Sequence, residues 1–363
     1  MQLTSQIKLK PTPEQAQALK DTLIAFNSAC NDASQIAWDN KCFSRFRLHK
    51  IVYYHLRGVT GLGSHCVYSV IAKVSQAYAK DKKTQRSFKS LGAMPQNGNA
   101  CTYQLAKSQV SIWTVTGRQH IPFVADDRNL KLLEGKRGEA GIVLKDGMWY
   151  LHVPCEVKCQ PLIDPQSYLG VDLGIVNLAT DSDGKVHSGK QINGLRHRHR
   201  KLRSKLQKKG TKSAKRLLKK RSKKEANFAK NENHRISKEI VATAKDTDRG
   251  IALEDLKGIT HRVTVRKSQR ATLTSWSFFQ LKTYIEYKAE LVGIPIIAVD
   301  PRNTSRTCPK CGHIDKANRP NQSTFKCVSC GFSGLADHIA AINIANVGCR
   351  AAGYQPNAVT SNS

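Results

Sequence analysis

Two Cys-x-x-Cys pairs near the C-terminus constrain the fold of this chain more than any other feature of its sequence. Cys308 and Cys311 form the first pair, and Cys327 and Cys330 form the second after fifteen intervening residues. Four thiolates at this spacing are typical of a tetrahedral structural Zn²⁺ site, which leaves no coordination position open for a catalytic water. His313 is an alternative ligand, but the four cysteines already complete the site. The sequence therefore predicts structural zinc.

The other seven of the eleven cysteines are expected to be ordinary thiols. An odd number of cysteines scattered over a chain of 363 residues argues against a disulfide framework in a reducing compartment. Buried, unpaired cysteine is also a common core residue.

The chain carries a large excess of positive charge. Its formal net charge is +32, from 59 Lys and Arg against 27 Asp and Glu. This excess implies a polyanionic partner, with nucleic acid the first candidate and an anionic membrane surface the second. The sequence has neither an apolar stretch of the roughly 20 residues that span a bilayer nor the apolar core of a secretory signal at its N-terminus. We therefore expect a cytoplasmic, nucleic-acid-binding protein with no membrane partner.

Much of the positive charge lies in a helical segment at residues 194–248, with a break at Lys209-Gly210-Thr211. Residues 196–230 contain seventeen Lys and Arg against one acidic residue, Glu225. Such a segment would repel itself if it faced only water, whereas binding to phosphates relieves the repulsion through counterion release. We predict that it contacts RNA or DNA; the alternative is a solvated charged helix.

The period of the apolar residues divides the N-terminal half of the chain. Residues 1–10 alternate as a strand, and residues 11–100 have helical patterning that begins at a capping box, Thr12-Pro13-Glu14-Gln15. From about residue 101 to 158 the period changes to two, with Asp146-Gly147 as a two-residue hairpin turn, and we assign residues 1–10 and 101–163 to one β-rich domain. This order predicts a β-barrel interrupted by a helical lobe.

The C-terminal half has a different order of elements. From residue 164 the pattern reads strand, strand, helical stretch, strand, helix, strand, helix, which suggests an α/β domain with a mixed sheet. We assign residues 164–307 and 331–347 to this domain, with the zinc ribbon inserted at 308–330 and a disordered tail at 348–363. The predicted fold class is therefore a multidomain mixture of α+β and α/β.

Three acidic residues occupy unusual positions in this second domain. Asp172 lies in the apolar strand LGVDLGI, Glu254 lies in GIALEDL, and Asp337 opens the helix ADHIAAINIA. A carboxylate in an otherwise buried strand is costly unless it is paired or binds a metal. Three carboxylates at one sheet edge suit Mg²⁺. Two such ions roughly 4 Å apart can activate a water and stabilise the leaving 3′ oxygen of a phosphodiester.

We therefore predict Asp172, Glu254 and Asp337 as catalytic ligands of two Mg²⁺ ions, with Mn²⁺ as an alternative. The alternative for any one of them is an edge-strand or helix-capping residue. Asp255 follows Glu254 but is expected to face the opposite side of the strand. Asp300 is expected to be a turn residue at the end of a strand.

Four segments resemble those of the TnpB family: LGVDLGIVNLAT, GIALEDLKGI, PRNTSRTCPKCG and ADHIAAINIA. These proteins are RNA-guided nucleases of IS200/IS605-type transposons and relatives of the type V CRISPR effectors. The resemblance covers about residues 168–346. It implies a wedge-like barrel, a helical recognition lobe and a RuvC-type, RNase H-like nuclease domain. One departure is Ile339, where the family often has Asn, while Asn343 is retained.

The resemblance also implies a function and its partners. A guide RNA transcribed from the transposon end would direct cleavage of double-stranded DNA beside a short adjacent motif, at the nucleoid of a bacterium or archaeon. The family's three acids map to Asp172, Glu254 and Asp337. The resemblance also places the basic segment beside the guide–target duplex. Arg306 could contact the scissile phosphate or have an ordinary surface role.

Two other functions stay open at this point. A nuclease-inactive, RNA-guided repressor is one, although relatives of that kind usually lose one or more of the acids. An RNA-independent transposase is the other, because a carboxylate triad suits that chemistry equally well. A monomer is favoured, but the sequence does not determine the oligomeric state.

Overall fold

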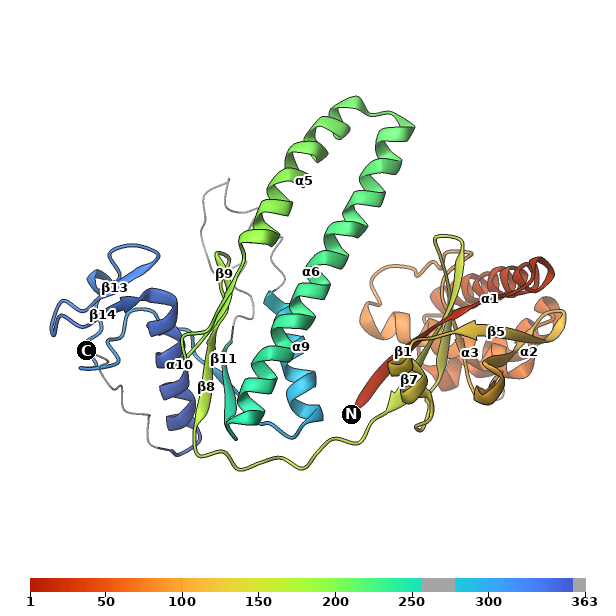
Figure 1. Ribbon diagram of the computed structural model, residues 1–363. Helices are drawn as coiled ribbons and strands as arrows, with labels where there is room; N and C mark the ends of the chain where they lie inside the picture. The colour runs from red at the N-terminus through yellow and green to blue at the C-terminus, as the bar shows by residue number, and fades with distance from the viewer. Residues whose placement is uncertain (99, 256–277, 355–363) are drawn as a thin grey trace. The chain divides into compact units, whose positions relative to one another are not determined.

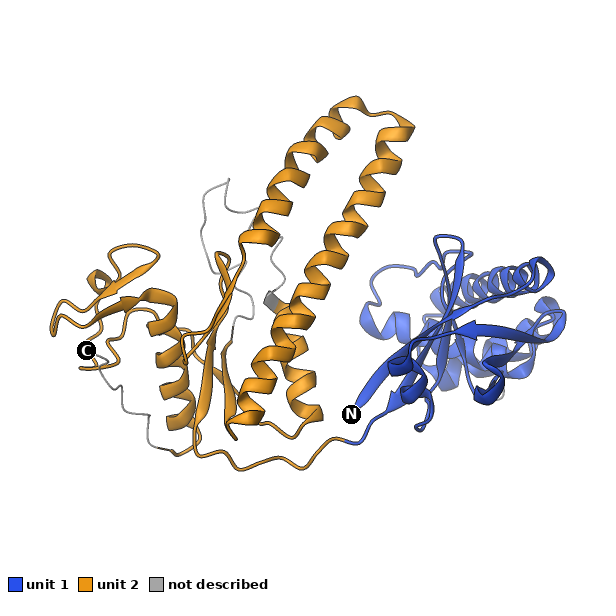
Figure 2. Cartoon of the chain, in the orientation of Figure 1, with its two compact units in different colours: residues 1–158 blue, residues 159–363 orange. Residues whose placement is uncertain are grey.

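The computed structural model describes residues 1–98, 100–255 and 278–354. The chain forms two compact units, Met1–Lys158 and Cys159–Ser363 (Figures 1 and 2). The basic stretch HRVTVRKSQR, at residues 261–270, and the last nine residues of the predicted tail lie outside the described ranges.

The boundary between the units comes five residues earlier than the sequence suggested. The backbone N–H of Gln160 donates to the carbonyl of Leu291 at 3.1 Å, and that of Ile163 donates to Gly293 at 2.9 Å. These bonds tie the segment after residue 158 to the second unit, so the barrel ends there rather than at residue 163.

The first unit contains a nearly closed, antiparallel seven-stranded sheet with strand order β2-β6-β7-β1-β5-β4-β3. Its strands are β1 (Gln2–Leu9), β2 (Met94–Gln96), β3 (Cys101–Gln104), β4 (Gln109–Thr114), β5 (Gly117–Val124), β6 (Ala140–Lys145) and β7 (Met148–Glu156). Asp146 and Gly147 have φ values of 55° and 76°, as a two-residue hairpin turn requires. The barrel-like sheet expected from the alternating pattern is therefore present.

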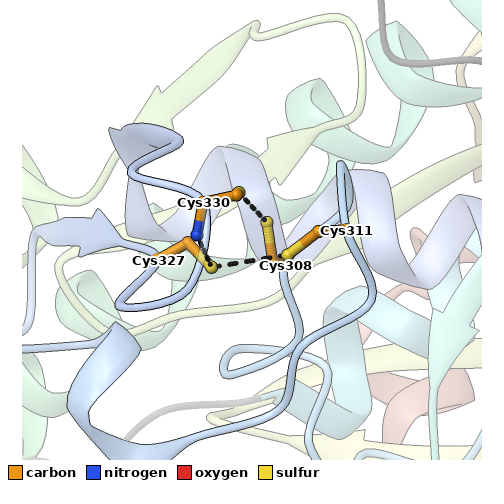
Figure 3. A group of neighbouring side chains, drawn as sticks. All are labelled: Cys308, Cys311, Cys327 and Cys330. Atoms are coloured by element: carbon orange, nitrogen blue, oxygen red, sulfur yellow. Dashed lines mark hydrogen bonds between the residues drawn. The ribbon is translucent and has the colours of Figure 1, made fainter.

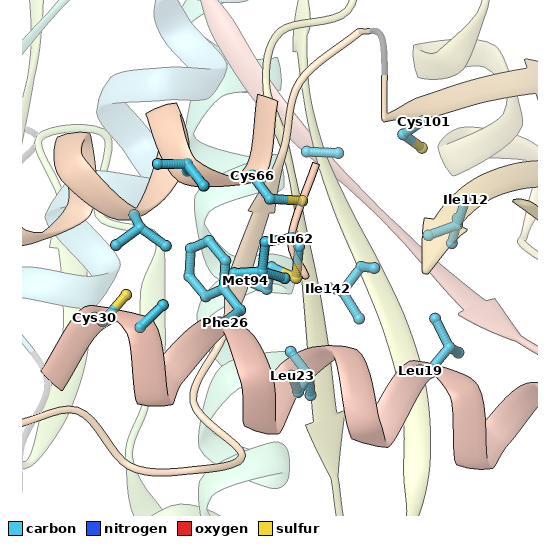
Figure 4. Close-up of a cluster of buried hydrophobic side chains, with 14 of the residues drawn as sticks. Leu19, Leu23, Phe26, Cys30, Leu62, Cys66, Met94, Cys101, Ile112 and Ile142 are labelled. Carbon is cyan, nitrogen blue, oxygen red and sulfur yellow. The ribbon is translucent and has the colours of Figure 1, made fainter. Parts of the chain in front are cut away.

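Helices α1 (Pro13–Asp39), α2 (Arg45–Thr60) and α3 (Ser64–Lys80) lie between β1 and β2. The predicted capping box is present: Thr12 Oγ1 accepts from Gln15 N–H at 3.3 Å, and Gln15 Oε1 accepts from Thr12 N–H at 3.1 Å. Apolar side chains of α1 pack with Met94 and Ile142 of the sheet (Figure 4).

Two elements of the first unit differ from the prediction. Strand β2 pairs with β6, so the chain returns to the sheet at Met94, inside the segment assigned to the helical lobe. A short helix, α4 (Asp127–Leu133), interrupts the β-rich segment. Asp126 caps it by accepting the N–H of Asn129 at 2.8 Å, a local signal that the period of the apolar residues does not contain.

The second unit is built on a mixed five-stranded sheet with strand order β10-β9-β8-β11-β12. Strands β8 and β11 are parallel to each other, as are β11 and β12, while β9 is antiparallel to β8 and β10 to β9. The strands are β8 (Tyr168–Asp172), β9 (Asn177–Asp181), β10 (Val186–Ser188), β11 (Gly250–Glu254) and β12 (Ile296–Val299).

Helices cover both faces of this sheet. On one face, α6 (Lys212–Asp246) and α9 (Phe278–Leu291) share a buried cluster with Leu169, Val171 and Leu253. On the other face, α10 (Ala336–Ala351) packs against Tyr168 and Ala252. Successive residues of β8 and β11 therefore point alternately to the α6–α9 face and to the α10 face.

Helix α10 lies unusually close to β8. An added Cβ at Gly170 would lie 2.0 Å from the carbonyl oxygen of Ala341, and one at Gly348 would lie 2.7 Å from the Cβ of Ala252. Small residues are therefore needed on both sides of this contact. Because Gly348 and Cys349 are buried in it, the helix continues to Ala351, and the predicted tail at 348 begins too early.

The basic segment forms a helical hairpin of α5 (Lys190–Lys209) and the N-terminal half of α6 (Figure 1). The break falls where the sequence placed it, at Gly210, whose φ is +64°. Glu225 accepts from Arg203 at 3.0 Å and lies 3.2 Å from His199 Nδ1, so it joins the two helices. Across the described parts of the chain, no helix is both long and apolar enough to cross a membrane.

Candidate active site

Asp172 and Glu254 occupy neighbouring ends of two parallel strands. Val171 of β8 pairs with Leu253 of β11, and Asp172 and Glu254 are the next residue of each strand. Both strands are apolar up to this point, because they lie in the middle of the sheet between helices. Carboxyl ends of parallel strands meet at one edge of a sheet, where α/β folds commonly place ligand sites.

The alternation of side chains selects Glu254 rather than Asp255 for this site. Glu254 follows Leu253, which faces α6 and α9, and therefore points to the α10 face with Asp172. Asp255 lies on the opposite side, where its Oδ1 is 3.6 Å from the Nζ of Lys282 on α9. The structure agrees with the predicted orientation of both residues.

Asp337 reaches the same place from the first turn of α10. Its Oδ2 accepts from Asn177 Nδ2 at 2.9 Å, and its Oδ1 lies 3.4 Å from an Nη atom of Arg319. The N-cap residue is Leu335, which makes no side-chain capping bond. The carboxylate of Asp337 is thus held by side chains from β9 and from the cysteine-containing segment.

Asp172 interacts electrostatically with both other acids. Burial, together with the nearby charges of Glu254 and Asp337, raises the pKa of Asp172 to about 7 against the opposing effect of Arg319. Burial also raises the pKa of Glu254, while a hydrogen bond from Thr304 and the charge of Arg319 lower it. Asp172 is therefore desolvated and close enough to both other carboxylates to be affected by their charges.

Three residues around the acids were missed by sequence reasoning. Asn177 and Arg319 contact Asp337, and Thr304 Oγ1 donates to Glu254 Oε1 at 2.6 Å. All three come from turns or strand ends whose positions depend on tertiary contacts. Thr304 lies inside PRNTSRTCPKCG, one of the segments that resemble the family, but Arg306 was the candidate site residue predicted from that segment.

Asp300 occupies an ordinary position. Asp300 Oδ1 accepts the N–H of Arg302 at 3.0 Å, as a turn residue at a strand end does. The backbone carbonyl of Arg306 accepts from Asn318 at 2.8 Å, which ties that residue into the loop before the cysteines. Among the described residues, Arg319 is the cation whose charge acts on Asp172 and Glu254 and whose side chain lies beside Asp337.

The four cysteines meet at one point (Figure 3). Their Sγ atoms all lie within 4.8 Å of one another, and the Cys308–Cys330 and Cys311–Cys327 pairs are each 3.6 Å apart. Tetrahedral Zn²⁺ with bonds of about 2.3 Å requires sulfur atoms about 3.8 Å apart. The cluster therefore fits a four-coordinate metal.

The cysteine module continues past its last cysteine. Strands β13 (Thr324–Lys326) and β14 (Ser333–Leu335) form a two-stranded sheet that runs directly into α10. The module thus ends at residue 335, not 330. Ile339 is 2% exposed and packs with Cys308, Phe325 and Cys327, so it joins α10 to the module through an apolar contact.

The carboxylates are less tightly gathered than the cysteines. Within the described ranges, the cysteines are the group whose ligand atoms are close enough together for one shared ion. The three acids do not form such a group.

Comparisons with known proteins agree with this architecture. Residues 152–257 match a family described as "Probable transposase", of the OrfB IS605 type, and residues 278–344 match the "Cas12f1-like, TNB domain". A "TnpB-like protein MJ0751" from Methanocaldococcus jannaschii is 30% identical over 203 residues, which cover 52% of this chain and 72% of that protein.

The chain belongs to the TnpB-like family. Another relative is the "CRISPR-associated endodeoxyribonuclease Cas12f1" of Sulfoacidibacillus thermotolerans, 34% identical over 216 residues. A third is the "Putative RNA-guided DNA endonuclease InsQ" of Escherichia coli K12, 26% identical over 244 residues. These matches cover 54% and 61% of this TnpB-like chain, respectively.

This TnpB-like chain spans only part of several relatives. It covers 50% of the Sulfoacidibacillus protein and 59% of the Escherichia coli protein. The fold is also similar to that of the protein in a solved Cas12f1–sgRNA–target DNA complex, with a TM-score of 0.59 at 16% sequence identity. That match covers 91% of this chain and 83% of the other, which supports the fold assignment.

The raised pKa of Asp172 predicts a stability cost at neutral and alkaline pH. Its pKa is about 7 in the folded protein and ordinarily 3.8, so the unfolded chain releases this proton first. The resulting loss of folding free energy grows as the pH rises from about 4 and reaches its full size above about 7. We expect Asp172→Asn to raise the free energy of unfolding at pH 8 without added divalent ions, with a gain that shrinks toward pH 5.

Urea denaturation of both proteins between pH 5 and 8 measures this effect. Asp255→Asn is the matched control, since that carboxylate lies on the other face beside Lys282 and should show no such gain. Equal stability of wild type and Asp172→Asn at pH 8 would contradict the electrostatic assignment.

Proposed function

We propose that this protein is a transposon-encoded, RNA-guided DNA endonuclease that cleaves double-stranded DNA beside a short adjacent motif. The observation that carries the proposal is the convergence of Asp172, Glu254 and Asp337, from three separate segments, at one edge of the second sheet. The domain that holds them would be RuvC-like. The names of the Cas12f1 and InsQ relatives support the RNA-guided endonuclease activity.

The chemistry of the donor set fits divalent magnesium or manganese. When bound, two such ions would activate the attacking water and stabilise the leaving 3′ oxygen of the cleaved strand. Asp172, Glu254 and Asp337 would hold these ions. The charge of Arg319 opposes the rise that burial causes in the pKa values of Asp172 and Glu254, and so favours the ionised forms that bind a metal.

Zinc would have a structural role in the four-cysteine module. The module carries Arg319 between its two cysteine pairs and leads through β14 into α10, which begins one residue before Asp337. Zinc would therefore stabilise the positions of Arg319 and Asp337 without taking part in the reaction. One zinc ion per purified chain, measured by mass spectrometry, is the expected content; a folded, active, zinc-free protein would argue against this role.

The hairpin of α5 and α6 would bind the guide RNA or its duplex with DNA. Its exposed lysines and arginines have few acidic neighbours, and Glu225 is already used in joining the two helices. A long charged hairpin with little buried apolar surface would be stabilised by a polyanion that binds along its sides. We predict that the complex contains one copy of the chain.

We predict that Asp172→Ala and Glu254→Gln each reduce Mg²⁺-dependent cleavage by on the order of a thousandfold or more. Both variants should keep the RNA that co-purifies with the wild type, because neither residue lies on the basic hairpin. Cleavage of a plasmid that matches this RNA measures activity, and sequencing identifies the RNA. Asp255→Asn is the matched control and should cut normally.

The same assay separates the proposal from its two alternatives. A wild-type protein that retains RNA but never cuts would indicate a repressor. A protein free of RNA that cuts transposon ends would indicate a transposase. Normal cutting by Asp172→Ala would show that the reaction takes place elsewhere.

The role of the hairpin predicts a steep dependence of RNA affinity on salt. If about 6 to 10 phosphates are contacted, affinity should fall by roughly 10³ to 10⁵ between 50 and 200 mM salt. Replacing the exposed Lys212, Lys215 and Lys220 with Gln should reduce the salt slope by about one for each lost contact. Filter binding at several salt concentrations tests this, with Asp172→Ala as the control that keeps the full slope. A flat response in the wild type would refute the role.

A further inference from the structure

We propose that Thr304 and Asn343 are positioning residues that fix the orientation of the Glu254 carboxylate for metal binding. The inference rests on the proposed function, since it concerns a ligand of the proposed magnesium centre. Helix α10 would then have two roles. It would supply Asp337 directly, and through Asn343 it would hold the turn whose Thr304 orients Glu254.

Thr304 makes the direct contact. Its Oγ1 donates to Glu254 Oε1 at 2.6 Å, and the two residues are 5% and 8% exposed. A buried hydrogen bond to a carboxylate is strong and restricts the rotation of that side chain. With Oε1 accepting this bond, Oε2 would be the oxygen left to bind an ion.

Asn343 holds the turn that presents Thr304. Its Nδ2 donates to the backbone carbonyls of Thr304 and Thr307 at 2.7 and 2.8 Å, and its side chain is 5% exposed. An amide can donate two hydrogen bonds from one nitrogen, which suits two carbonyls of the same turn. The backbone N–H groups of Arg306 and Thr307 also donate to the carbonyl of Asn303, and these bonds further stabilise the turn.

The position of Asn343 in α10 explains why this matters for the whole site. Asp337 lies at the start of the helix, and Asn343 lies six residues later on a side that reaches the turn before Cys308. A shift of α10 would therefore move Asp337 and, through Asn343 and Thr304, change the orientation of Glu254. Residues that hold a metal ligand in this manner typically contribute 10- to 100-fold to metal affinity.

The substitution Thr304→Val separates orientation from packing. Valine keeps the shape of threonine but cannot donate to Glu254, whereas Thr304→Ser keeps the hydroxyl and loses a methyl group. Thr307→Val is the matched control in the same turn, because its hydroxyl donates to the carbonyl of Asn303 at 2.8 Å and not to a carboxylate. Asn343→Ala removes the support of the turn.

The test is Mn²⁺ binding to the full-length, zinc-loaded protein, measured from the loss of the free Mn²⁺ signal in electron paramagnetic resonance. Binding that Asp172→Ala abolishes defines the carboxylate site. We expect Thr304→Val and Asn343→Ala to weaken this binding by about tenfold or more. Thr304→Ser and Thr307→Val should stay within about threefold of the wild type, and thermal unfolding should show that every variant is folded.

The outcomes distinguish this inference from the proposed function. If the wild type and Asp172→Ala bind Mn²⁺ equally, the proposed metal centre itself is wrong. If Asp172-dependent binding is present and Thr304→Val leaves it unchanged, the orienting role of Thr304 is wrong. If Thr304→Ser weakens binding as much as Thr304→Val, packing rather than the hydroxyl is responsible, which also overturns the proposal.

Discussion

The burial of Asp172 beside two other carboxylates, Glu254 at the end of β11 and Asp337 in the first turn of α10, is the constraint on which the second unit depends. Asp172 and Glu254 are held side by side by the strand register, and burial with these charges raises the pKa of Asp172 to about 7. Such an arrangement opposes folding unless cations or hydrogen bonds offset it. Arg319 and Thr304 provide part of that offset, and a bound divalent metal would provide the rest.

The position of α10 determines whether the three acids meet. Gly170 lets the backbone of the helix approach β8, and Ile339 fastens its first turns to the cysteine module. Ile339 stands where the family often has Asn, so in this chain an apolar contact occupies that position. The module therefore contacts the three acids through α10 and through Arg319.

The residues with a strong local signal were predictable from sequence, and those defined by tertiary contacts were not. The capping box at Thr12, the turn at Asp146 and the cysteine spacing each depend on a few neighbouring residues. The carboxylates were visible because charge is rare in apolar strands. Thr304 and Arg319 act on acids that are distant in sequence, and a polar residue in a loop carries no mark of such a contact. The end of α10 was missed because its last turn is stabilised by packing on Ala252.

The central claim is that Asp172, Glu254 and Asp337 hold two divalent ions between them. Anomalous diffraction from crystals of the full-length protein soaked in Mn²⁺ would test it most directly. We predict two peaks about 4 Å apart, both beside the carboxylates of Asp172, Glu254 and Asp337. Manganese bound elsewhere, or by a set of residues that excludes Asp172, would contradict the claim.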